Sequence, residues 1–184
     1  MTLTETPICN FGEKAKSFDL LSTANKKISL NDIKGENGTL IMFICNHCPY
    51  VKAVVKDIVK DTKYLETLGI KSVAIMSNDV KNYPEDSFEN MVSFSKLHNF
   101  SFPYLIDETQ KIAKEYGAVC TPDFFGYNKN FELQYRGRIR ELKNLKPVHK
   151  GNSDLRVAMQ LIAASGKGPK NQIPSMGCNI KWFK

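Results

Sequence analysis

The junction between residues 39–45 and the stretch that follows constrains the fold more than any other part of the sequence. TLIMFIC is a continuous apolar run flanked by a glycine and, shortly after, a proline, which is typical of a strand buried on both faces of a sheet. From Pro49 onward, apolar residues recur at helical spacing: Val51, Val54, Val55, Ile58, Val59, Leu65 and Leu68. Gly69 then suits a left-handed helix C-cap. A buried strand that leads directly into a helix predicts an α/β layer structure.

The rest of the chain continues this alternation of strands and helices. We expect a hairpin over 16–35, a buried strand over 70–77, a helix over 84–100, a short strand with an Asp-capped helix over 102–117, a hairpin over 122–138 and a helix from Ser153 or Asp154 to 165. Residues 167–184 are dense in Gly and Pro and predict an irregular C-terminal extension. With 184 residues, 42% of them hydrophobic, we expect one domain over 1–184 with a central mixed sheet flanked by helices.

The charge pattern favours a solvated surface over a nucleic-acid site. The chain has 26 Lys and Arg against 19 Asp and Glu, a net charge of +7. Its lysines alternate with acids, whereas nucleic-acid binders cluster them on one face, and the basic run 142–150 has no interleaved aromatic residues. No stretch approaches the roughly 18 to 20 apolar residues that cross a bilayer. We therefore expect neither a nucleic acid nor a membrane as partner.

The cysteines indicate a compartment in which thiols stay reduced. The first 20 residues lack a basic region followed by an apolar run, so we expect no secretory signal and a cytoplasmic protein. In the cytosol, five cysteines are reactive or buried more often than they are bridged.

Two of these cysteines, Cys45 and Cys48, stand at the strand–helix junction. Proline is favoured at the first helical position, which makes Cys48 the N-cap of the helix that Pro49 begins. The free N–H groups and the helix dipole then favour the Cys48 thiolate, and a protonated His47 would lower its pKa further. We therefore predict Cys48 as the nucleophile and Cys45 as a second sulfur able to release a mixed disulfide.

Two other interpretations of this stretch remain open. Both cysteines can be small apolar residues buried at a strand end. Cys45, His47 and Cys48 can also be metal ligands, although no second Cys or His cluster supplies the remaining positions of a closed site. We expect no metal and no dissociable cofactor.

The stretch YGAVCTPDFFGY, residues 116–127, is the second informative segment. Pro122 follows Thr121 just before a predicted strand, a place that tolerates proline. A cis bond there would leave the amide and carbonyl of Thr121 open to an extended substrate, whereas an ordinary trans proline is the commoner state. Cys120 is two residues away and is either a resolving thiol or a buried one. Phe124, Phe125, Tyr127 and Trp182 are interpreted as core or tail-docking residues.

A strand ending in Cys, a helix opening with CP, and a TP before a late hairpin together resemble the thioredoxin fold. The segments NHCPYVKA, CTPDFF, YRGR and GCNIKW resemble the peroxiredoxin-like branch of that fold, the redoxin or AhpC/TSA-like family. The resemblance places Cys48 at the attacking position and Val51 where thioredoxin has its second cysteine. It also matches Pro122 to the cis-proline of the family.

The resemblance has two departures. Peroxiredoxins usually carry Thr or Ser three residues before the peroxidatic cysteine, where this chain has Cys45. Their supporting arginine has only candidates here: Arg136, Arg138 and Arg140. In the tail, Cys178 can fold back over the groove and take part in thiol exchange, whereas Cys9, expected before the first strand, is interpreted as incidental.

These features predict a thiol–disulfide oxidoreductase that acts on a protein or small-molecule disulfide and draws electrons from another thiol system. Cys48 attacks, Cys45 or a substrate thiol resolves, His47 tunes the thiolate, and Thr121 with Pro122 holds the substrate chain. A thiol peroxidase is one alternative, and a non-enzymatic thioredoxin-fold binding module is the other. The physiological substrate and the oligomeric state are left open.

Overall fold

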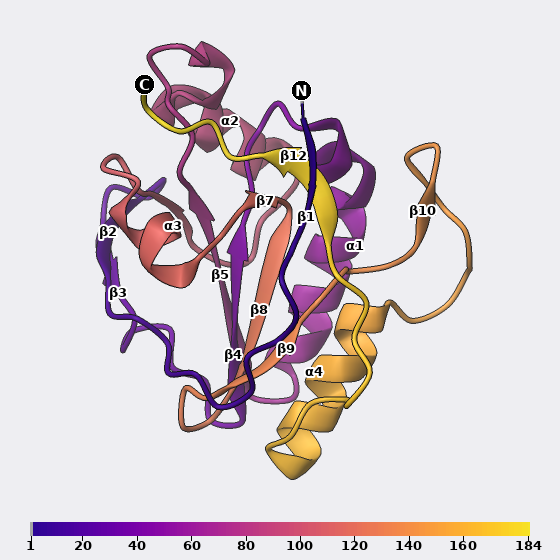
Figure 1. The fold of residues 1–184 in the computed structure, drawn as a ribbon. Helices are drawn as coiled ribbons and strands as arrows, with labels where there is room; N and C mark the ends of the chain where they lie inside the picture. Colours follow the sequence, from indigo (N-terminus) through magenta and orange to yellow (C-terminus); the bar gives the residue numbers. More distant parts are fainter. Residues whose placement is uncertain (1) are drawn as a thin grey trace.

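A seven-stranded mixed sheet forms the centre of the molecule (Figure 1). The structure is a computed structural model and describes residues 2–184. The strands lie in the order β3 (Lys27–Ser29), β2 (Asp19–Ser22), β6 (Tyr104–Ile106), β5 (Ile70–Met76), β4 (Gly38–Phe43), β8 (Asp123–Asn128) and β9 (Leu133–Arg136). β4 pairs parallel with β5 and antiparallel with β8, which confirms the predicted α/β class with a mixed sheet.

Strand β4 is buried along its whole length, as the apolar run predicted. Its alternate residues point to opposite faces, so Leu40 and Met42 pack into one core cluster and Ile41 and Phe43 into another. The strand ends at Phe43, two residues earlier than expected, although the N–H of Ile44 still donates to the carbonyl of Ile75 at 3.1 Å.

Helices cover both faces of the sheet. α1 (Pro49–Glu66), α2 (Phe88–Leu97) and α4 (Asp154–Ser165) contribute to one core cluster, and α3 (Lys111–Tyr116) contributes to the other. Figure 1 shows α1 and α4 on one side of the sheet and α3 on the opposite side. Among residues 2–184, no helix is both long enough and apolar enough to cross a membrane.

Several helix ends differ from the sequence predictions. The helix expected from 84 is instead a 3-10 turn, η1 (Pro84–Asp86), followed by α2, because Ser87 caps α2 by accepting from the N–H of Asn90. The first helix stops at Glu66, before Gly69, which has the expected positive φ of 75°. Ser153 is the N-cap of α4, one of the two predicted candidates. The N-cap of α3 is Gln110, although Asp107 Oδ2 accepts from the N–H of Ala113.

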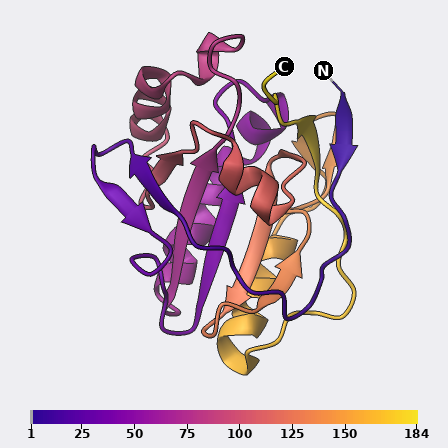
Figure 2. The same cartoon turned by 60° about the vertical axis from the view of Figure 1, so that its left-hand side comes forward.

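A second, three-stranded sheet joins the two ends of the chain, in the order β1 (Leu3–Glu5), β12 (Met176–Asn179) and β7 (Cys120–Thr121). Figures 1 and 2 both show the chain ends at the same end of the molecule, where β12 runs beside β1. The extension 167–184 therefore contains a strand and is not irregular throughout. Cys9 follows β1, which corrects its expected place before the first strand. A small hairpin, β10 (Leu142–Lys143) with β11 (Lys146–Pro147), was also not predicted.

Candidate active site

Cys48 is the N-cap residue of α1, as the position of Pro49 predicted. Its φ of −65° and ψ of 122° are extended, and Pro49 occupies the first turn, where its missing N–H leaves no bond unmade. The chain leaves the buried strand β4 and turns at residues 44–47, which carries both cysteines into the interior. Cys48 has 0% and Cys45 1% of its surface exposed. The local sequence thus fixes the helix start and the position of the sulfur.

The Cys48 sulfur lies among hydrogen-bond donors that favour its thiolate. The thiol of Cys45 is the strongest of them, and the thiol and N–H of Cys178 and the N–H of Val51 add to it. Burial opposes ionisation, but the donors outweigh it and lower the pKa of Cys48 from 9.0 to about 5. In its protonated form the thiol donates to the Thr121 carbonyl oxygen, 3.1 Å from Sγ.

The other thiols have the opposite shift. The hydrogen bond that Cys45 donates to Cys48, together with burial, raises the pKa of Cys45 well above 9.0. Burial, followed by the bond to Cys48, raises the pKa of Cys178 to about 12. Burial also raises the pKa of Cys120 strongly and that of Cys9 to about 11. None of the five cysteines, all within the described residues, is in a disulfide. One thiolate is therefore supported by thiols that keep their protons.

A buried carboxylate that sequence reasoning missed holds His47. Asp86 is completely buried, and its Oδ2 lies 2.7 Å from Nδ1 of His47 and accepts a bond from the Asn78 amide at 2.7 Å. Its Oδ1 accepts from the backbone N–H groups of Asn46, at 2.7 Å, and of His47, at 3.3 Å. The partners come from positions 8 to 40 residues away. Asp86 stands at the start of the helix expected over 84–100, and no local pattern there indicates a bond to His47.

Asp86 and His47 each favour the charged form of the other. The bond to Asp86 is the largest influence on His47 and raises its pKa above 6.5, although burial opposes this. Burial is the largest influence on Asp86, but the bonds from His47 and Asn78 together outweigh it and lower its pKa. The His47 ring also stacks on Tyr83, with centroids 5.8 Å apart. The imidazole next to Cys48 is thus fixed in place, and its protonated form is favoured.

The Thr121–Pro122 peptide bond is cis, the minority state that the family resemblance favoured. The backbone of Thr121, however, is not open to an extended substrate as predicted. The Thr121 carbonyl accepts a bond from the Cys48 thiol, and Thr121 is paired with Cys178 where β7 runs antiparallel to β12. The Thr121 hydroxyl lies 3.3 Å from Cys45 Sγ. The predicted residues Cys45, Cys48, Thr121 and Cys178 therefore meet at one point.

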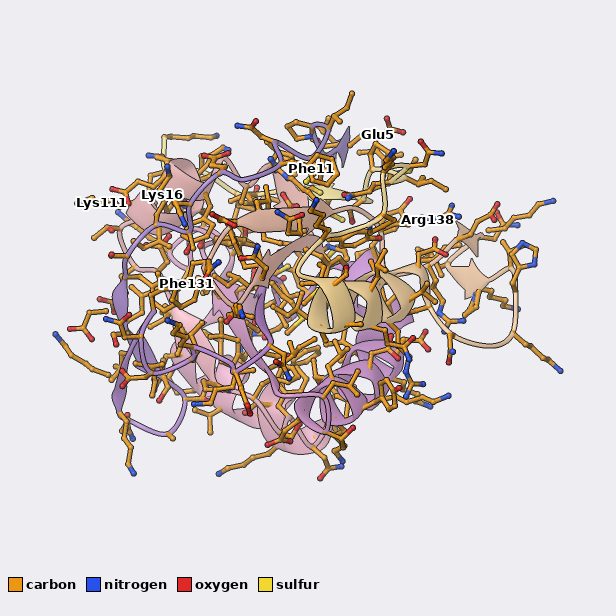
Figure 3. The ribbon with its side chains drawn as sticks, turned by 90° about the horizontal axis from the view of Figure 1, so that it is seen from below. Glu5, Phe11, Lys16, Lys111, Phe131 and Arg138 are labelled. Carbon is orange, nitrogen blue, oxygen red and sulfur yellow. The ribbon has the colours of Figure 1, made fainter. Side chains whose placement is uncertain are left out.

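The three arginine candidates have partners away from Cys48. Arg136 is buried and forms an ion pair with Asp123 at 3.0 Å, while its guanidinium lies 4.4 Å from the centre of the Phe125 ring. Arg138 pairs with Asp154 at 2.6 Å and Arg140 with Asp57 at 3.0 Å. Arg138 and Glu5, both labelled in Figure 3, are among the residues that line a cavity of about 260 Å³.

The aromatic residues have the structural roles expected for them. Phe124, Phe125 and Tyr127 are buried in the core, and Trp182 lies in the tail against Lys114, whose Nζ is 5.6 Å from the centre of its ring. Cys120 is fully buried and its thiol donates to the carbonyl of Pro122 at 3.5 Å, while Cys9 packs in the core cluster on the α3 side.

The ligand atoms of Cys45, His47 and Asp86 lie within 4.8 Å of one another, close enough to surround a metal ion. Their existing bonds fit an ion poorly. Each Asp86 oxygen already accepts two N–H bonds, and one of these comes from the Nδ1 of His47 that would have to bind the metal. Cys45 is bonded instead to Thr121 and Cys48, so no step below depends on a metal.

The mixed sheet, the cysteine N-cap and the cis-proline opposite it define a thioredoxin-fold protein with a thiolate at a helix start. The AhpC/TSA family model matches residues 11–142, and the chain belongs to the AhpC/TSA family. Family and fold together indicate a redox function in general.

The relatives of known structure agree with this classification. An uncharacterized conserved protein from Geobacillus kaustophilus is 38% identical, with coverage of 100% of this chain and 97% of its own and a TM-score of 0.94. A hypothetical protein from Sinorhizobium meliloti 1021 is 33% identical, with 98% of each chain covered and a TM-score of 0.90. The thioredoxin domain of a thiol-disulfide oxidoreductase from Bacteroides vulgatus, at 14% identity, shares the fold over 76% of this chain and 91% of its own, with a TM-score of 0.59. No curated protein matches the sequence.

Proposed function

We propose that this protein is a thiol–disulfide oxidoreductase in which the Cys48 thiolate is the nucleophile. The observation that carries the proposal is the set of donors around the Cys48 sulfur, which lowers its pKa to about 5 while the neighbouring thiols stay protonated. Near neutral pH this sulfur is ionised and its neighbours are not, and only the thiolate attacks a disulfide.

The exchange begins when the Cys48 thiolate attacks one sulfur of a substrate disulfide. A Cys48–substrate disulfide forms, the substrate S–S bond breaks, and the other half leaves as a thiolate that takes a proton from water. A second thiol then attacks Cys48 and releases the first half of the substrate. A dithiol reductant from outside the protein restores the thiols, so the catalytic cycle requires no dissociable cofactor.

His47 and Asp86 act in this scheme as positioning residues. The carboxylate holds the imidazolium through Nδ1, and its positive charge favours the thiolate one residue further along the chain. The cis-proline loop supplies the Thr121 carbonyl and hydroxyl on the opposite side of the two sulfurs.

A thiol peroxidase is the second candidate, and the complete burial of Cys48 favours it. A peroxide is small enough to reach a sulfur that a polypeptide disulfide cannot. The thiolate would take one oxygen from the peroxide to form a sulfenic acid and release water or an alcohol, and a second thiol would condense with it, forming a disulfide and releasing water.

Three cysteine variants test the proposal in two assays: reduction of insulin disulfides by dithiothreitol and consumption of hydrogen peroxide. Cys48→Ser should lower insulin reduction to the uncatalysed rate, and Cys9→Ser, a buried cysteine outside the site, should leave it unchanged. Cys45→Ser should keep a nucleophile and retain the first step of exchange. If Cys48→Ser stays active and Cys45→Ser does not, the assignment of the nucleophile is wrong. Peroxide consumption much faster than insulin reduction in the wild type would favour the second candidate.

A further inference from the structure

Strand β12 lies where a substrate of a thiol–disulfide oxidoreductase would be held. It runs antiparallel to β7, with Cys178 paired with Thr121 and Asn179 with Cys120. The N–H and the thiol of Cys178 both donate to the sulfur of Cys48. A bound extended chain would use the same edge of β7, because strand addition relies on free main-chain groups at a sheet edge.

The close packing of β12 against the cis-proline loop, Thr121–Pro122, requires a glycine at position 177. A Cβ atom built on Gly177 would lie 2.1 Å from the carbonyl oxygen of Thr121 and 3.1 Å from the nitrogen of Pro122. Those contacts are backbone atoms that a flexible side chain cannot relieve. On either side, the Ser175 hydroxyl donates to the Pro122 carbonyl at 2.8 Å and the Ile180 N–H to the Val119 carbonyl at 3.2 Å. The strand and the loop are therefore fitted to each other.

While β12 is seated, no polypeptide disulfide can reach Cys48, whose sulfur is fully buried. The outer side of the strands at this end of the molecule is open to solvent. Met176 and Leu3, on β12 and β1, are 42% and 51% exposed. The cavity of about 260 Å³ lies between the start of β12, Pro122 and the first turns of α1 at Tyr50 and Val54. This space gives the strand room to move without disturbing the seven-stranded sheet.

The tail just after β12 is hydrogen-bonded to the same residues that hold His47. The Lys181 N–H donates to Asn78 Oδ1 at 2.8 Å, and the amide of Asn78 donates in turn to Asp86. The Lys181 Nζ lies 5.7 Å from the centre of the Tyr83 ring, which stacks on His47. A substrate that displaces the tail therefore changes contacts next to the imidazole as well.

We propose that β12 is a built-in occupant of the substrate groove and that it carries the resolving thiol, Cys178. The inference rests on the proposed exchange function. An extended disulfide substrate must displace β12 and pair with Thr121 in its place. When β12 returns, it brings Cys178 back to Cys48 and drives the product chain out of the groove. Cys45, two residues after the end of β4 and bonded to Thr121, supports the thiolate instead.

The reaction is balanced within one cycle. Cys48 attacks the substrate disulfide and the first substrate thiolate leaves. Cys178 loses its proton to water and attacks the Cys48 sulfur, and the second substrate thiolate leaves as the Cys48–Cys178 disulfide forms. Two protein thiols are oxidised and one substrate disulfide is reduced to two thiols. An external dithiol then reduces the Cys48–Cys178 bond.

The first test disturbs the packing of β12 against the cis-proline loop and leaves every cysteine in place. Gly177→Val should raise the rate constant for alkylation of the Cys48 thiolate by iodoacetamide, taken from a pH profile, at least about tenfold, because buried groups react through local opening. Leu161→Val puts a valine at an exposed position of α4, outside the site, and should leave this rate constant unchanged. Hydrogen exchange at residues 176–179 reports whether the strand has left its seat.

Unchanged Cys48 alkylation in a Gly177→Val protein whose strand exchanges faster would overturn the occupant proposal. If the strand does not exchange faster, the deletion of 176–184 replaces it, with the fold checked by circular dichroism, and the same criterion applies.

The second test identifies the resolving thiol by peptide mass mapping after one equivalent of a disulfide reagent such as dithiobis(nitrobenzoate). Cys45→Ser should still form the Cys48–Cys178 disulfide, whereas Cys178→Ser should retain a mixed disulfide on Cys48. A Cys45–Cys48 disulfide in the wild type and in Cys178→Ser would overturn the assignment of Cys178. If Cys48→Ser itself retains exchange, the proposed function fails. If Cys48 is essential but the β12 variants behave like the wild type, only this inference fails.

Discussion

The ionisation of Cys48 should make the stability of the folded protein depend on pH. The pKa of Cys48 is about 5 in the folded protein, against 9.0 for an ordinary thiol. A depressed folded pKa contributes stability that is fully present above the unfolded value and is lost as pH falls through the folded value. The free energy of unfolding should therefore rise between pH 5 and pH 8. Above that window the buried thiols of Cys45, Cys178 and Cys9 act in the opposite direction, because their pKa values are raised.

The magnitude follows from the size of the shift. Each pH unit between the two pKa values is worth about 1.4 kcal/mol, so the three units from pH 5 to pH 8 give about 4 kcal/mol. A domain of this size has a total stability of about 5–15 kcal/mol, so the change is large enough to measure. His47 opposes it: its raised pKa contributes stability that is full below 6.5 and is lost as pH rises through the folded value. The contribution of Cys48 must therefore be isolated with a variant.

Cys48→Ser provides that comparison, since the hydroxyl has a similar shape and does not ionise in this range. Urea unfolding would be followed by far-UV circular dichroism at pH 5, 6, 7 and 8 with a phosphine reductant present. The wild-type free energy of unfolding minus that of Cys48→Ser should rise by about 4 kcal/mol over this range. Cys9→Ser should show the pH dependence of the wild type. A difference that stays flat with pH would refute the reasoning, because Cys48 would then have the same pKa in the folded and unfolded states.

Two further predictions concern the charges buried around the site. Asp86→Asn keeps the shape of the side chain but removes its charge, so the pKa of His47 should fall toward or below 6.5. An NMR titration of the His47 ring protons measures this pKa, and Glu108→Gln, at an exposed position, is the control. An unchanged His47 pKa would contradict its pairing with Asp86. Arg136→Met leaves the buried carboxylate of Asp123 without its partner and should lower the free energy of unfolding by about 3–5 kcal/mol in urea. Arg138→Met, whose partner Asp154 is exposed, should lower the free energy of unfolding by less than about 1 kcal/mol. Equal losses in the two variants would show that the buried Arg136–Asp123 pair stabilises the protein no more than the exposed pair.

The position of Cys48 could be predicted because it depends on neighbouring residues alone. An apolar run long enough for one buried strand, a proline with its fixed φ, and valines at helical spacing place the helix start at one residue. The same local rules gave the hairpins over 16–35 and 122–138 and offered Ser153 as one of two caps for the last helix, but they did not give the hairpin of β10 and β11. They gave the wrong start for the second helix, because Ser87 competes with Pro84 and accepts the bond that begins α2.

The partners of the Cys48 sulfur could not be predicted in the same way, because they come from distant segments. The Thr121 carbonyl is 73 residues away along the chain, and Asp86 is 39 residues from His47. The strand character of 176–179 was hidden by glycine, which lowers strand propensity but is required where β12 touches the cis-proline loop. The residue that weakened the strand prediction is the one that permits the contact.

The burial of Cys48 and its low pKa have the same structural origin. A thiol that is only desolvated becomes less acidic, as Cys9 and Cys120 do. Cys48 becomes more acidic because the segments that bury it also supply donors: the turn before α1 provides the Cys45 thiol, and β12 provides the N–H and thiol of Cys178. Removing β12 from the groove therefore exposes the sulfur and withdraws two donors at once. In the closed protein the most acidic thiol, Cys48, is buried. If a substrate displaces β12, as proposed, the pKa of Cys48 should rise because two of its donors are lost.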